Sequence, residues 1–206
     1  YLIPAIKGCD PRDMVSLHKK MDQAIPFNLM AKCGIDLAVY DLVGRADQVP
    51  VYTLTGGKRV DRIPVVAAVG IGPPDQTARM AVELVKKGFR TIKIKIGLSP
   101  KKDYDRVRIV RETLGKNINI RVDANQGYER SDALSTLEKM DELELEWIEQ
   151  PLPDWDLEGS AMLADHLNTP IALDESIYTV HDVERAMAAG TVDIVNVKIP
   201  KCGGIY

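Results

Sequence analysis

The sequence predicts an α/β protein, a modified TIM (β/α) barrel with six of its strands present, preceded by the remnant of an α+β N-terminal capping domain. From about residue 63 onward, short β-branched segments alternate with helical segments, which is typical of repeated βα units in a parallel sheet. No Gly-x-Gly-x-x-Gly motif follows the first expected strand, and this disfavours a Rossmann sheet. A closed barrel has eight strands, so we expect the sequence to be part of a longer chain.

The expected strands are short runs rich in Ile, Val and Leu, each bounded by turn residues. With right-handed crossovers, parallel strands that follow one another in this order favour a barrel. The expected strands cover residues 63–69, 91–96, 118–123, 145–149, 171–174 and 193–198.

The expected helices between these strands carry start and stop signals. The first follows a pair of prolines and ends at Gly88, which predicts a C-cap. Ser99 and Pro100 predict the start of the second helix, and Thr179 with Asp182 predicts a capping pair for the last. The two remaining helices are expected at residues 132–140 and 157–167.

Residues 1–58 differ from the βα repeat, and we interpret them as the end of the capping domain and its linker, with the barrel covering residues 59–206. Helical patterns cover about residues 10–24 and 29–45. Gly56 and Gly57 then separate the two regions. The apolar face of the second helix is expected to carry Ile35, Leu37, Ala38 and Leu42.

Composition excludes several classes of protein. The chain has 27 basic and 30 acidic residues and a net charge of −3, without the basic stripe that nucleic-acid binding requires. The longest apolar stretch, residues 63–71, is shorter than the roughly 18 residues of a membrane span. Three widely spaced cysteines predict reduced, buried thiols and a cytoplasmic location. We also expect a homo-oligomer.

Three carboxylates end successive expected strands: Asp123, Glu149 and Asp174. Active sites of β/α barrels lie at the carboxyl ends of the strands, and adjacent strands are about 4.8 Å apart. Unpaired carboxylates at matching heights would repel one another, so the pattern predicts a bound divalent cation. Oxygen ligands favour Mg²⁺, with Mn²⁺ as a substitute, and the absence of a nearby His or Cys disfavours zinc.

Three lysines accompany these carboxylates. Lys93 and Lys95 are two residues apart on one strand, so they share a face, and each is expected to lower the pKa of the other toward neutrality. Lys198 ends the sixth expected strand, across the barrel mouth. A base on each side of a substrate suits removal and return of the proton α to a carboxylate. Lys201 is expected to be a surface charge.

Several short motifs occur together: Gly34-Ile35-Asp36, Asp41-Leu42-Val43-Gly44-Arg45, Leu54-Thr55-Gly56-Gly57, Lys93-Ile94-Lys95, Val122-Asp123-Ala124-Asn125, Ile148-Glu149-Gln150-Pro151, Asp174-Glu175-Ser176, and Lys198 ahead of Gly203-Gly204. Taken together they resemble the enolase superfamily, and within it the muconate lactonizing enzyme subgroup of the mandelate racemase/muconate lactonizing enzyme family. This resemblance implies a Mg²⁺ enzyme with a capping domain over a modified barrel, in which Lys95 and Lys198 act as acid and base on opposite faces. The choice of subgroup rests on Asp174-Glu175-Ser176 and on Lys198, because the His that mandelate-racemase-like members use follows a seventh strand, beyond the six expected here.

Several further polar and aromatic residues lie beside the expected site. Asn125, Gln150 and Glu175 are expected to orient the metal ligands or to contact substrate, with simple turn formation as the alternative. Trp147, which alternates with Ile148, is expected to be a packing residue, and Trp155 to cover a strand end rather than border a pocket.

The predicted function is abstraction of the proton α to a carboxylate of a small substrate, by an isomerase that racemises or epimerises an amino-acid derivative. A muconate-type cycloisomerase or a syn-dehydratase would use the same residues, with one lysine as base and the other as an electrostatic partner. The alternative from another class is a non-catalytic, metal-binding barrel fragment, because an open sheet of six strands exposes two edges.

Overall fold

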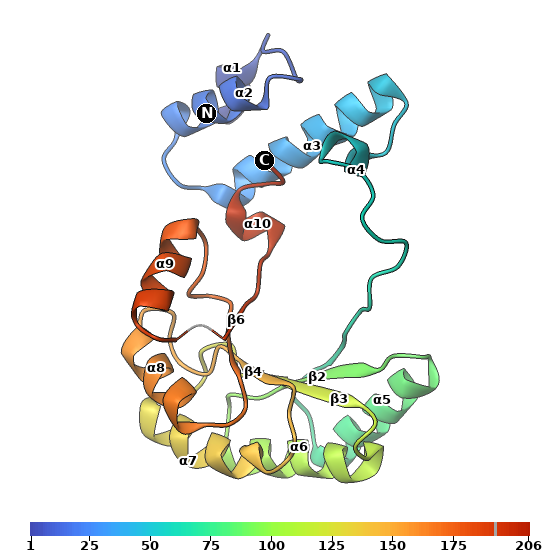
Figure 1. Cartoon of the computed structure of the whole chain (residues 1–206), viewed down its shortest axis with the longest axis vertical. Helices are drawn as coiled ribbons and strands as arrows, with labels where there is room; N and C mark the ends of the chain where they lie inside the picture. The colour runs from blue at the N-terminus through green and yellow to red at the C-terminus, as the bar shows by residue number, and fades with distance from the viewer. Residues whose placement is uncertain (192) are drawn as a thin grey trace. The chain divides into compact units, whose positions relative to one another are not determined.

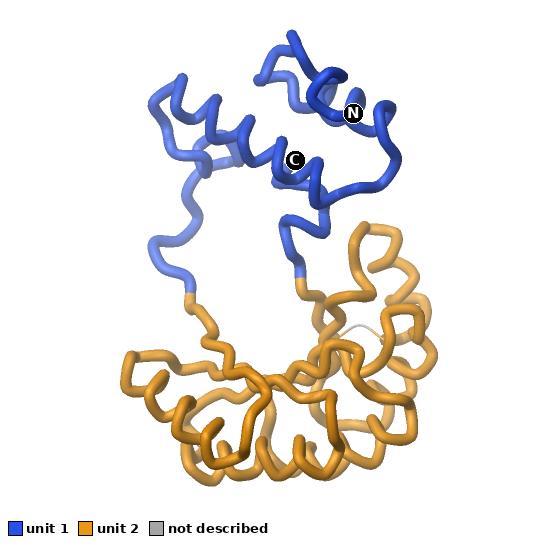
Figure 2. The backbone as a smooth tube through the Cα atoms, turned by 180° about the vertical axis from the view of Figure 1, so that it is seen from behind, with its two compact units in different colours: residues 1–63, 197–206 blue, residues 64–196 orange. Residues whose placement is uncertain are grey.

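The computed structural model describes residues 1–191 and 193–206, and the chain forms two compact units. Unit 1 contains residues 1–63 and 197–206, and unit 2 contains residues 64–196 (Figure 2). The two units are defined by how densely their residues contact one another. The domain boundary at residue 58 was instead expected from the change in sequence pattern, and it stays a prediction.

Unit 2 is built on a parallel sheet whose six strands lie in sequence order, β1 to β6. This arrangement confirms the predicted fold class. The strands are shorter than expected, because only residues 67–69 of the first expected strand pair with β2, and Ile63 and Val65 are exposed. The strands are β1 (Ala67–Val69), β2 (Thr91–Lys95), β3 (Asn119–Asp123), β4 (Trp147–Glu149), β5 (Ile171–Leu173) and β6 (Ile194–Val195).

Helices connect these strands, and α5 to α8 lie along one face of the curved sheet (Figure 1). The residues of β2 to β4 that face these helices, among them Ile92, Ile94, Val122 and Ile148, are fully buried in the hydrophobic core. Side chains alternate along a strand, so Lys93, Lys95 and Asp123 project from the other face. The helices are α5 (Pro74–Lys86), α6 (Pro100–Leu114), α7 (Arg130–Asp141), α8 (Leu157–His166) and α9 (Val180–Ala188).

The predicted helices of unit 2 are confirmed, and the ends of α7 and α8 lie within two residues of the expected ones. The N-cap of α6 is formed differently from the prediction. Thr179 and Asp182 form both halves of a capping box at the start of α9. Gly88, just after α5, adopts a φ of 100° that favours glycine. Ser99 occupies the N-cap of α6, but its side chain makes no capping hydrogen bond. Asp103 in the first turn of that helix accepts from the Ser99 amide instead.

Unit 1 is helical. The two predicted helices are confirmed as α2 (Met14–Ala24) and α3 (Leu29–Asp47). Asp13 caps α2 by accepting a hydrogen bond from the Ser16 amide. Three helices of four or five residues were not predicted, because such short segments show no helical periodicity: α1 (Leu2–Ile6), α4 (Val51–Leu54) and α10 (Ile199–Cys202).

The predicted apolar face of α3 is wrong, because Leu37 and Leu42 are 40% and 55% exposed, Ala38 is also exposed, and Ile35 is only half-buried. Helices α2, α4 and α10 all contact α3. The residues of α3 that are buried include Lys32 and Asp36, so the buried side of this helix is not its most apolar side. Packing by neighbouring helices therefore overrides the simple hydrophobic pattern of the sequence. The buried residues of α3 are Lys32, Cys33, Asp36, Val43 and Gly44.

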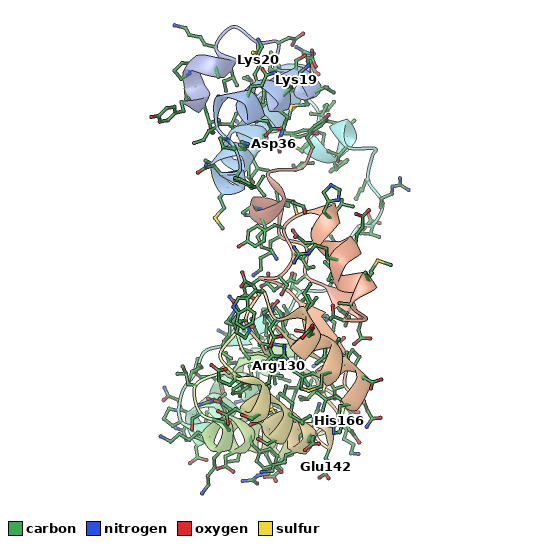
Figure 3. All side chains as sticks on the ribbon, turned by 90° about the vertical axis from the view of Figure 1, so that its left-hand side faces the viewer. Lys19, Lys20, Asp36, Arg130, Glu142 and His166 are labelled. Carbon is green, nitrogen blue, oxygen red and sulfur yellow. The ribbon has the colours of Figure 1, made fainter. Side chains whose placement is uncertain are left out.

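Asp36, which lies on α3 (Figure 3), binds the backbone of residues 205 and 206. Its carboxylate is fully buried, hydrogen-bonds Nε2 of His18 at 2.8 Å, and accepts from the amides of Ile205 at 2.7 Å and Tyr206 at 3.4 Å. A Cβ on Gly204 would lie 2.2 Å from Asp36 Cγ, so only glycine permits this approach. Residues 204–206 are therefore held against α3.

The environments of Lys201 and the cysteines differ from expectation. Lys201 is only 5% exposed, so the predicted surface charge is wrong, because α10 packs on α3. All three cysteines are unpaired; Cys33 is buried as predicted, Cys9 is half-buried, and Cys202 is exposed, contrary to prediction. Within residues 1–191 and 193–206, no helix combines the length and apolarity needed to cross a membrane.

Asp141, at the end of α7, connects that helix to the segment before β5. It accepts hydrogen bonds from the amide and side chain of Asn168 at 3.0 and 2.8 Å. It also accepts from the amide and hydroxyl of Thr169 at 2.7 and 2.5 Å. Burial alone would raise the pKa of Asp141, but these hydrogen bonds together lower it below the ordinary value.

Asp141→Asn is expected to lower the free energy of unfolding at pH 7 by about 1–3 kcal/mol, because an amide cannot accept all four hydrogen bonds. The lowered pKa means that the carboxylate contributes stability above its ordinary pKa and loses it as the pH falls through the lowered value. The difference between wild type and variant should therefore shrink at pH 3. Urea denaturation at both pH values measures this difference.

Asp165→Asn provides the control, because Asp165 is an exposed carboxylate on α8. It should change the free energy of unfolding by less than about 0.5 kcal/mol. An Asp141→Asn effect of the same size at pH 3 and pH 7 would contradict the prediction.

Candidate active site

The carboxyl ends of β2, β3 and β4 bring charged residues into one row across the sheet. Lys95 pairs in register with Asp123, and Asp123 pairs with Glu149. Each of these residues alternates with an apolar residue that faces the helices, so burial of the apolar set fixes the register and places the charged set on the other face.

The lysines of β2 hold the carboxylates of this row. Lys93 Nζ lies 2.8 Å from Asp123 Oδ2 and 2.8 Å from Glu149 Oε1. Lys95 Nζ lies 2.5 Å from Asp123 Oδ2 and 2.5 Å from Asn125 Oδ1. Asp123 and Glu149 are 1% and 3% exposed, so their negative charges need these partners inside the protein.

The ion pairs set the proton affinities of the row. Burial would raise the pKa of Asp123, but hydrogen bonds from Lys93 and Lys95, the charge of Lys93, and the Asn125 amide lower it below the ordinary value. Burial would lower the pKa of Lys93, but Asp123 and Glu149 raise it above the ordinary value. The predicted lowering of the lysine pKa is therefore wrong for Lys93, because Asp123 and Glu149 outweigh the effect of burial.

Gln150 organises the backbone around Asp174. Its side chain is fully buried, and Oε1 accepts from the amides of Asp174 at 2.9 Å and Ser176 at 3.2 Å. Nε2 donates to the Leu152 carbonyl at 2.9 Å and to Ser176 Oγ at 2.8 Å. Gln150 itself has a φ of 35°, an uncommon conformation that these contacts stabilise. Asp174, which is also fully buried, is thereby fixed just after β5.

Asn125 connects Lys95 to the loop after β5. Its amide N–H donates to Asp123 Oδ1 at 2.9 Å, and its side-chain Nδ2 donates to Glu175 Oε1 at 2.9 Å. The other oxygen of Glu175, Oε2, is buried and has no hydrogen-bond partner among the residues that the structure describes. The segments after β3 and β5 are therefore joined by polar contacts beside the lysines.

Asn196 belongs to the same cluster and was missed in the sequence. Its Nδ2 donates to Glu149 Oε1 at 2.9 Å, the oxygen that Lys93 also contacts. Asn196 lies two residues before Lys198 in the expected sixth strand, and the two-residue period of a strand would have predicted that both lie on one face. This strand period was the sequence signal that could have identified Asn196 as a site residue.

Lys198 belongs to the other compact unit: it is the N-cap residue of α10, in unit 1. The other predicted site residues all belong to unit 2, and the position of Lys198 opposite Lys95 stays a prediction. The site residues in unit 2 are Lys93, Lys95, Asp123, Asn125, Glu149, Gln150, Asp174 and Glu175.

The donor set suits a hard divalent cation. Within residues 1–191 and 193–206, no three Asp, Glu, His or Cys side chains converge closely enough to hold a metal ion, and Lys93 contacts both Asp123 and Glu149. However, the carboxylates at these strand ends offer only oxygen, and Oε2 of Glu175 is a buried acceptor without a partner. Oxygen donors of this kind fit Mg²⁺ or Mn²⁺.

The two tryptophans have different roles. Trp147 stacks under the guanidinium of Arg121, whose central carbon lies 3.4 Å from the ring centre, so it packs against a neighbouring strand as expected. Trp155 is 74% exposed and lines a cavity of about 220 Å³. Glu175 and Ser176 line the same cavity. The cavity contains none of the predicted metal ligands or lysines, so the expectation that Trp155 covers a strand end stays a prediction.

The fold and this row of residues define an α/β-barrel protein with buried carboxylates and lysines at the carboxyl ends of its strands. A family model described as "Enolase C-terminal domain-like" matches residues 76–206. A second, described as "Mandelate racemase / muconate lactonizing enzyme, N-terminal domain", matches residues 1–56. The chain belongs to the mandelate racemase/muconate lactonizing enzyme family of the enolase superfamily, which confirms the resemblance seen in the sequence.

Similar proteins extend this assignment. The L-Ala-D/L-Glu epimerase of Clostridium acetobutylicum is 36% identical over 100% of this chain and 58% of its own length. The crystal structure of the N-succinyl Arg/Lys racemase of Bacillus cereus matches with a TM-score of 0.96 and 34% identity, over 100% of this chain and 56% of that one. A dipeptide epimerase of Enterococcus faecalis, complexed with Mg and the dipeptide L-Leu-L-Tyr, matches with a TM-score of 0.92 and 39% identity, over 99% and 57%. The chain therefore spans somewhat more than half the length of these relatives.

Lys93→Met is expected to lower the free energy of unfolding by about 3–5 kcal/mol in metal-free protein, because it leaves two buried carboxylates without their shared cation. The measurement is urea denaturation at pH 7 in the presence of a chelator. Lys86→Met is the matched control, because Lys86 is 66% exposed and pairs with Glu83 on the surface. Its cost should stay below about 1 kcal/mol. Equal effects of the two substitutions would show that Lys93 does not neutralise the row.

Proposed function

We propose that the complete protein is a Mg²⁺-dependent isomerase that racemises or epimerises an amino-acid derivative by removing and returning the proton α to its carboxylate. The observation that carries this proposal is Lys95, whose ammonium is held by Asp123 and Asn125 at the carboxyl edge of the sheet. A lysine fixed beside buried carboxylates can serve as a base for a substrate carried to this edge.

Asp123, Glu149 and Asp174 would hold the cation, and Mn²⁺ would substitute for Mg²⁺. When bound, the cation would supply Lewis-acid stabilisation of the negative charge that develops on the substrate carboxylate. It would also replace part of the neutralising charge that Lys93 gives Asp123 and Glu149. Gln150, Asn125 and Glu175 would orient these carboxylates through the hydrogen bonds described above.

Two lysines would carry the proton. Lys95 would remove it from one face of the substrate α-carbon, and Lys198 would deliver a proton to the opposite face, which inverts the configuration. Reaction in the other direction exchanges the two roles. A proton transfer of this kind needs each Nζ within hydrogen-bond reach of the α-carbon, so fixed positions of the lysines govern the rate.

The substrate is proposed to be a small carboxylate, such as a dipeptide or an N-acyl amino acid. The names of the matched proteins, which include a dipeptide epimerase and an N-succinyl Arg/Lys racemase, support this class. The three unpaired cysteines support a reducing compartment such as the cytoplasm. A homo-oligomer remains a prediction, which sedimentation of the complete protein would test.

The expected outcome with the complete protein and Mg²⁺ in D₂O is deuterium uptake at the α-carbon, with loss of optical activity for N-acyl amino acids and a change in optical rotation for dipeptides. Lys95→Ala and Lys198→Ala should each lower racemisation by about 10²–10⁴-fold, because general acid–base catalysis contributes factors of this size. NMR and polarimetry measure the two changes.

Lys139→Ala is the control, because Lys139 is exposed on α7, and it should leave the rate unchanged. Protein that binds Mg²⁺ but exchanges no α-proton in any of these substrates would contradict racemisation. Conversion without inversion would instead favour cycloisomerisation or dehydration, in which only one of the two lysines acts as a base. Binding of Mg²⁺ without conversion of any substrate would favour the non-catalytic, metal-binding alternative.

A further inference from the structure

Asp103, in the first turn of α6, is the centre of a buried polar network. It is fully buried, and its Oδ2 accepts hydrogen bonds from the amides of Gly97 at 3.0 Å, Leu98 at 3.1 Å and Ser99 at 2.9 Å. The same oxygen accepts from the Tyr128 hydroxyl at 2.9 Å. One carboxylate therefore binds three successive amides of the segment after β2 and a side chain from the segment after β3.

Arg106 extends this network to a third segment. Its guanidinium pairs with Oδ1 of Asp103, and its Nε donates to the carbonyl of Gly72 at 2.9 Å. Arg106 is only 4% exposed, so both members of the ion pair are removed from water. The segments that follow β1, β2 and β3 are thus joined at the carboxyl edge of the sheet.

Two glycines allow the joined segments to touch. A Cβ on Gly97 would lie 2.3 Å from the carbonyl oxygen of Ala124, and a Cβ on Gly127 would lie 2.2 Å from the carbonyl oxygen of Gly97. Backbone atoms cannot yield to such a Cβ, so this contact requires glycine at both positions. The backbone just after Lys95 is therefore packed directly against the loop that contains Asn125.

Tyr128 stays a hydrogen-bond donor in this network. It is 3% exposed, and burial together with the negative charge of Asp103 raises its pKa well above the ordinary value. The phenol is therefore protonated at neutral pH and continues to donate to Asp103. The four donors to Oδ2 named above are thus neutral groups, and among residues 1–191 and 193–206 it is Arg106 that pairs with the charge of Asp103.

We propose that Asp103 is a positioning residue for Lys95, an inference that rests on the proposed function. Gly97 follows Lys95 by two residues, and Asn125, which contacts Lys95 Nζ, precedes Gly127 by two residues. By holding these two backbones together, Asp103 fixes where the Lys95 ammonium lies relative to the α-carbon of the substrate. Misplacement of a catalytic group by about 1 Å can cost about 10²-fold in rate.

Asp141 offers a matched comparison within the same chain. It is also an aspartate that accepts four hydrogen bonds from a neighbouring segment. However, Asp141 is the last residue of α7, next to Glu142, whereas Arg130 marks the other end of this helix (Figure 3). The Asp141 end of α7 precedes β4 and so adjoins the amino edge of the sheet, away from the carboxyl edge where Lys95 lies. Asp141→Asn therefore controls for loss of stability alone.

The experiment compares Asp103→Asn, Tyr128→Phe and Asp141→Asn in the complete protein. Amide hydrogen exchange should lose protection at residues 97–99 in Asp103→Asn and keep it in Asp141→Asn. With each enantiomer of one substrate, Asp103→Asn should lower kcat for racemisation by about 10–10²-fold with little change in KM. Tyr128→Phe, which removes one donor, should give a smaller change in the same direction.

The α-proton exchange of each enantiomer separates positioning from general destabilisation. If Lys95 is displaced, exchange should fall for the enantiomer whose proton faces Lys95 and persist for the enantiomer whose proton faces Lys198. A loss of folded protein would lower both in equal proportion. Equal loss for the two enantiomers, or an effect of Asp141→Asn equal to that of Asp103→Asn, would overturn the proposal.

Failure of the proposed function would look different. Wild-type protein would then exchange neither enantiomer, and the hydrogen-exchange comparison alone would decide whether Asp103 holds residues 97–99. If Asp103→Asn does not fold, Tyr128→Phe decides the catalytic part, since an unchanged kcat in that variant would overturn the role of the network.

Discussion

The site depends on one electrostatic constraint, which is that carboxylates on neighbouring parallel strands must be buried together. Asp123 and Glu149 are almost inaccessible to water, and their mutual repulsion would oppose the register that the hydrophobic core imposes. Lys93 and Lys95 remove this conflict by placing ammonium groups between and beside them. The cluster is therefore charged yet compatible with folding, and a divalent cation could take over part of the same neutralising role.

The polar contacts around this row bind loops rather than strands. Gln150 holds the segment around Asp174, Asn125 bridges to Glu175, and Asp103 gathers the segments after β1, β2 and β3 together with Arg106. Loops that follow parallel strands have few backbone partners of their own, so buried side-chain acceptors give them a defined shape. A rigid row of charges on the strands and a set of fixed loops around it are both needed if a base is to lie at a set distance from a substrate.

The site residues whose positions depend only on the strand pattern could be predicted from the sequence. Asp123 and Glu149 each end an apolar run one βα unit apart, so their convergence followed from the parallel fold. The face of α3 and the raised pKa of Lys93 depend on which neighbours pack there, and local patterns do not contain that information. Asp103 resembles an ordinary first-turn acidic residue of a helix, so its contact with Tyr128, 25 positions away, could be found only in the structure.

The hydrogen bond between Asp36 and the amide of Ile205 joins residues 169 positions apart in the chain. Unit 1 is therefore continuous in space but interrupted in sequence, because the whole of unit 2 is inserted within it. In the order of synthesis α3 precedes unit 2, so Asp36 can bind the amide of Ile205 only after the whole of unit 2 has been made. Closing such a long loop adds to the entropy cost of folding. The contact that completes unit 1 therefore forms only after all of unit 2 has been synthesised.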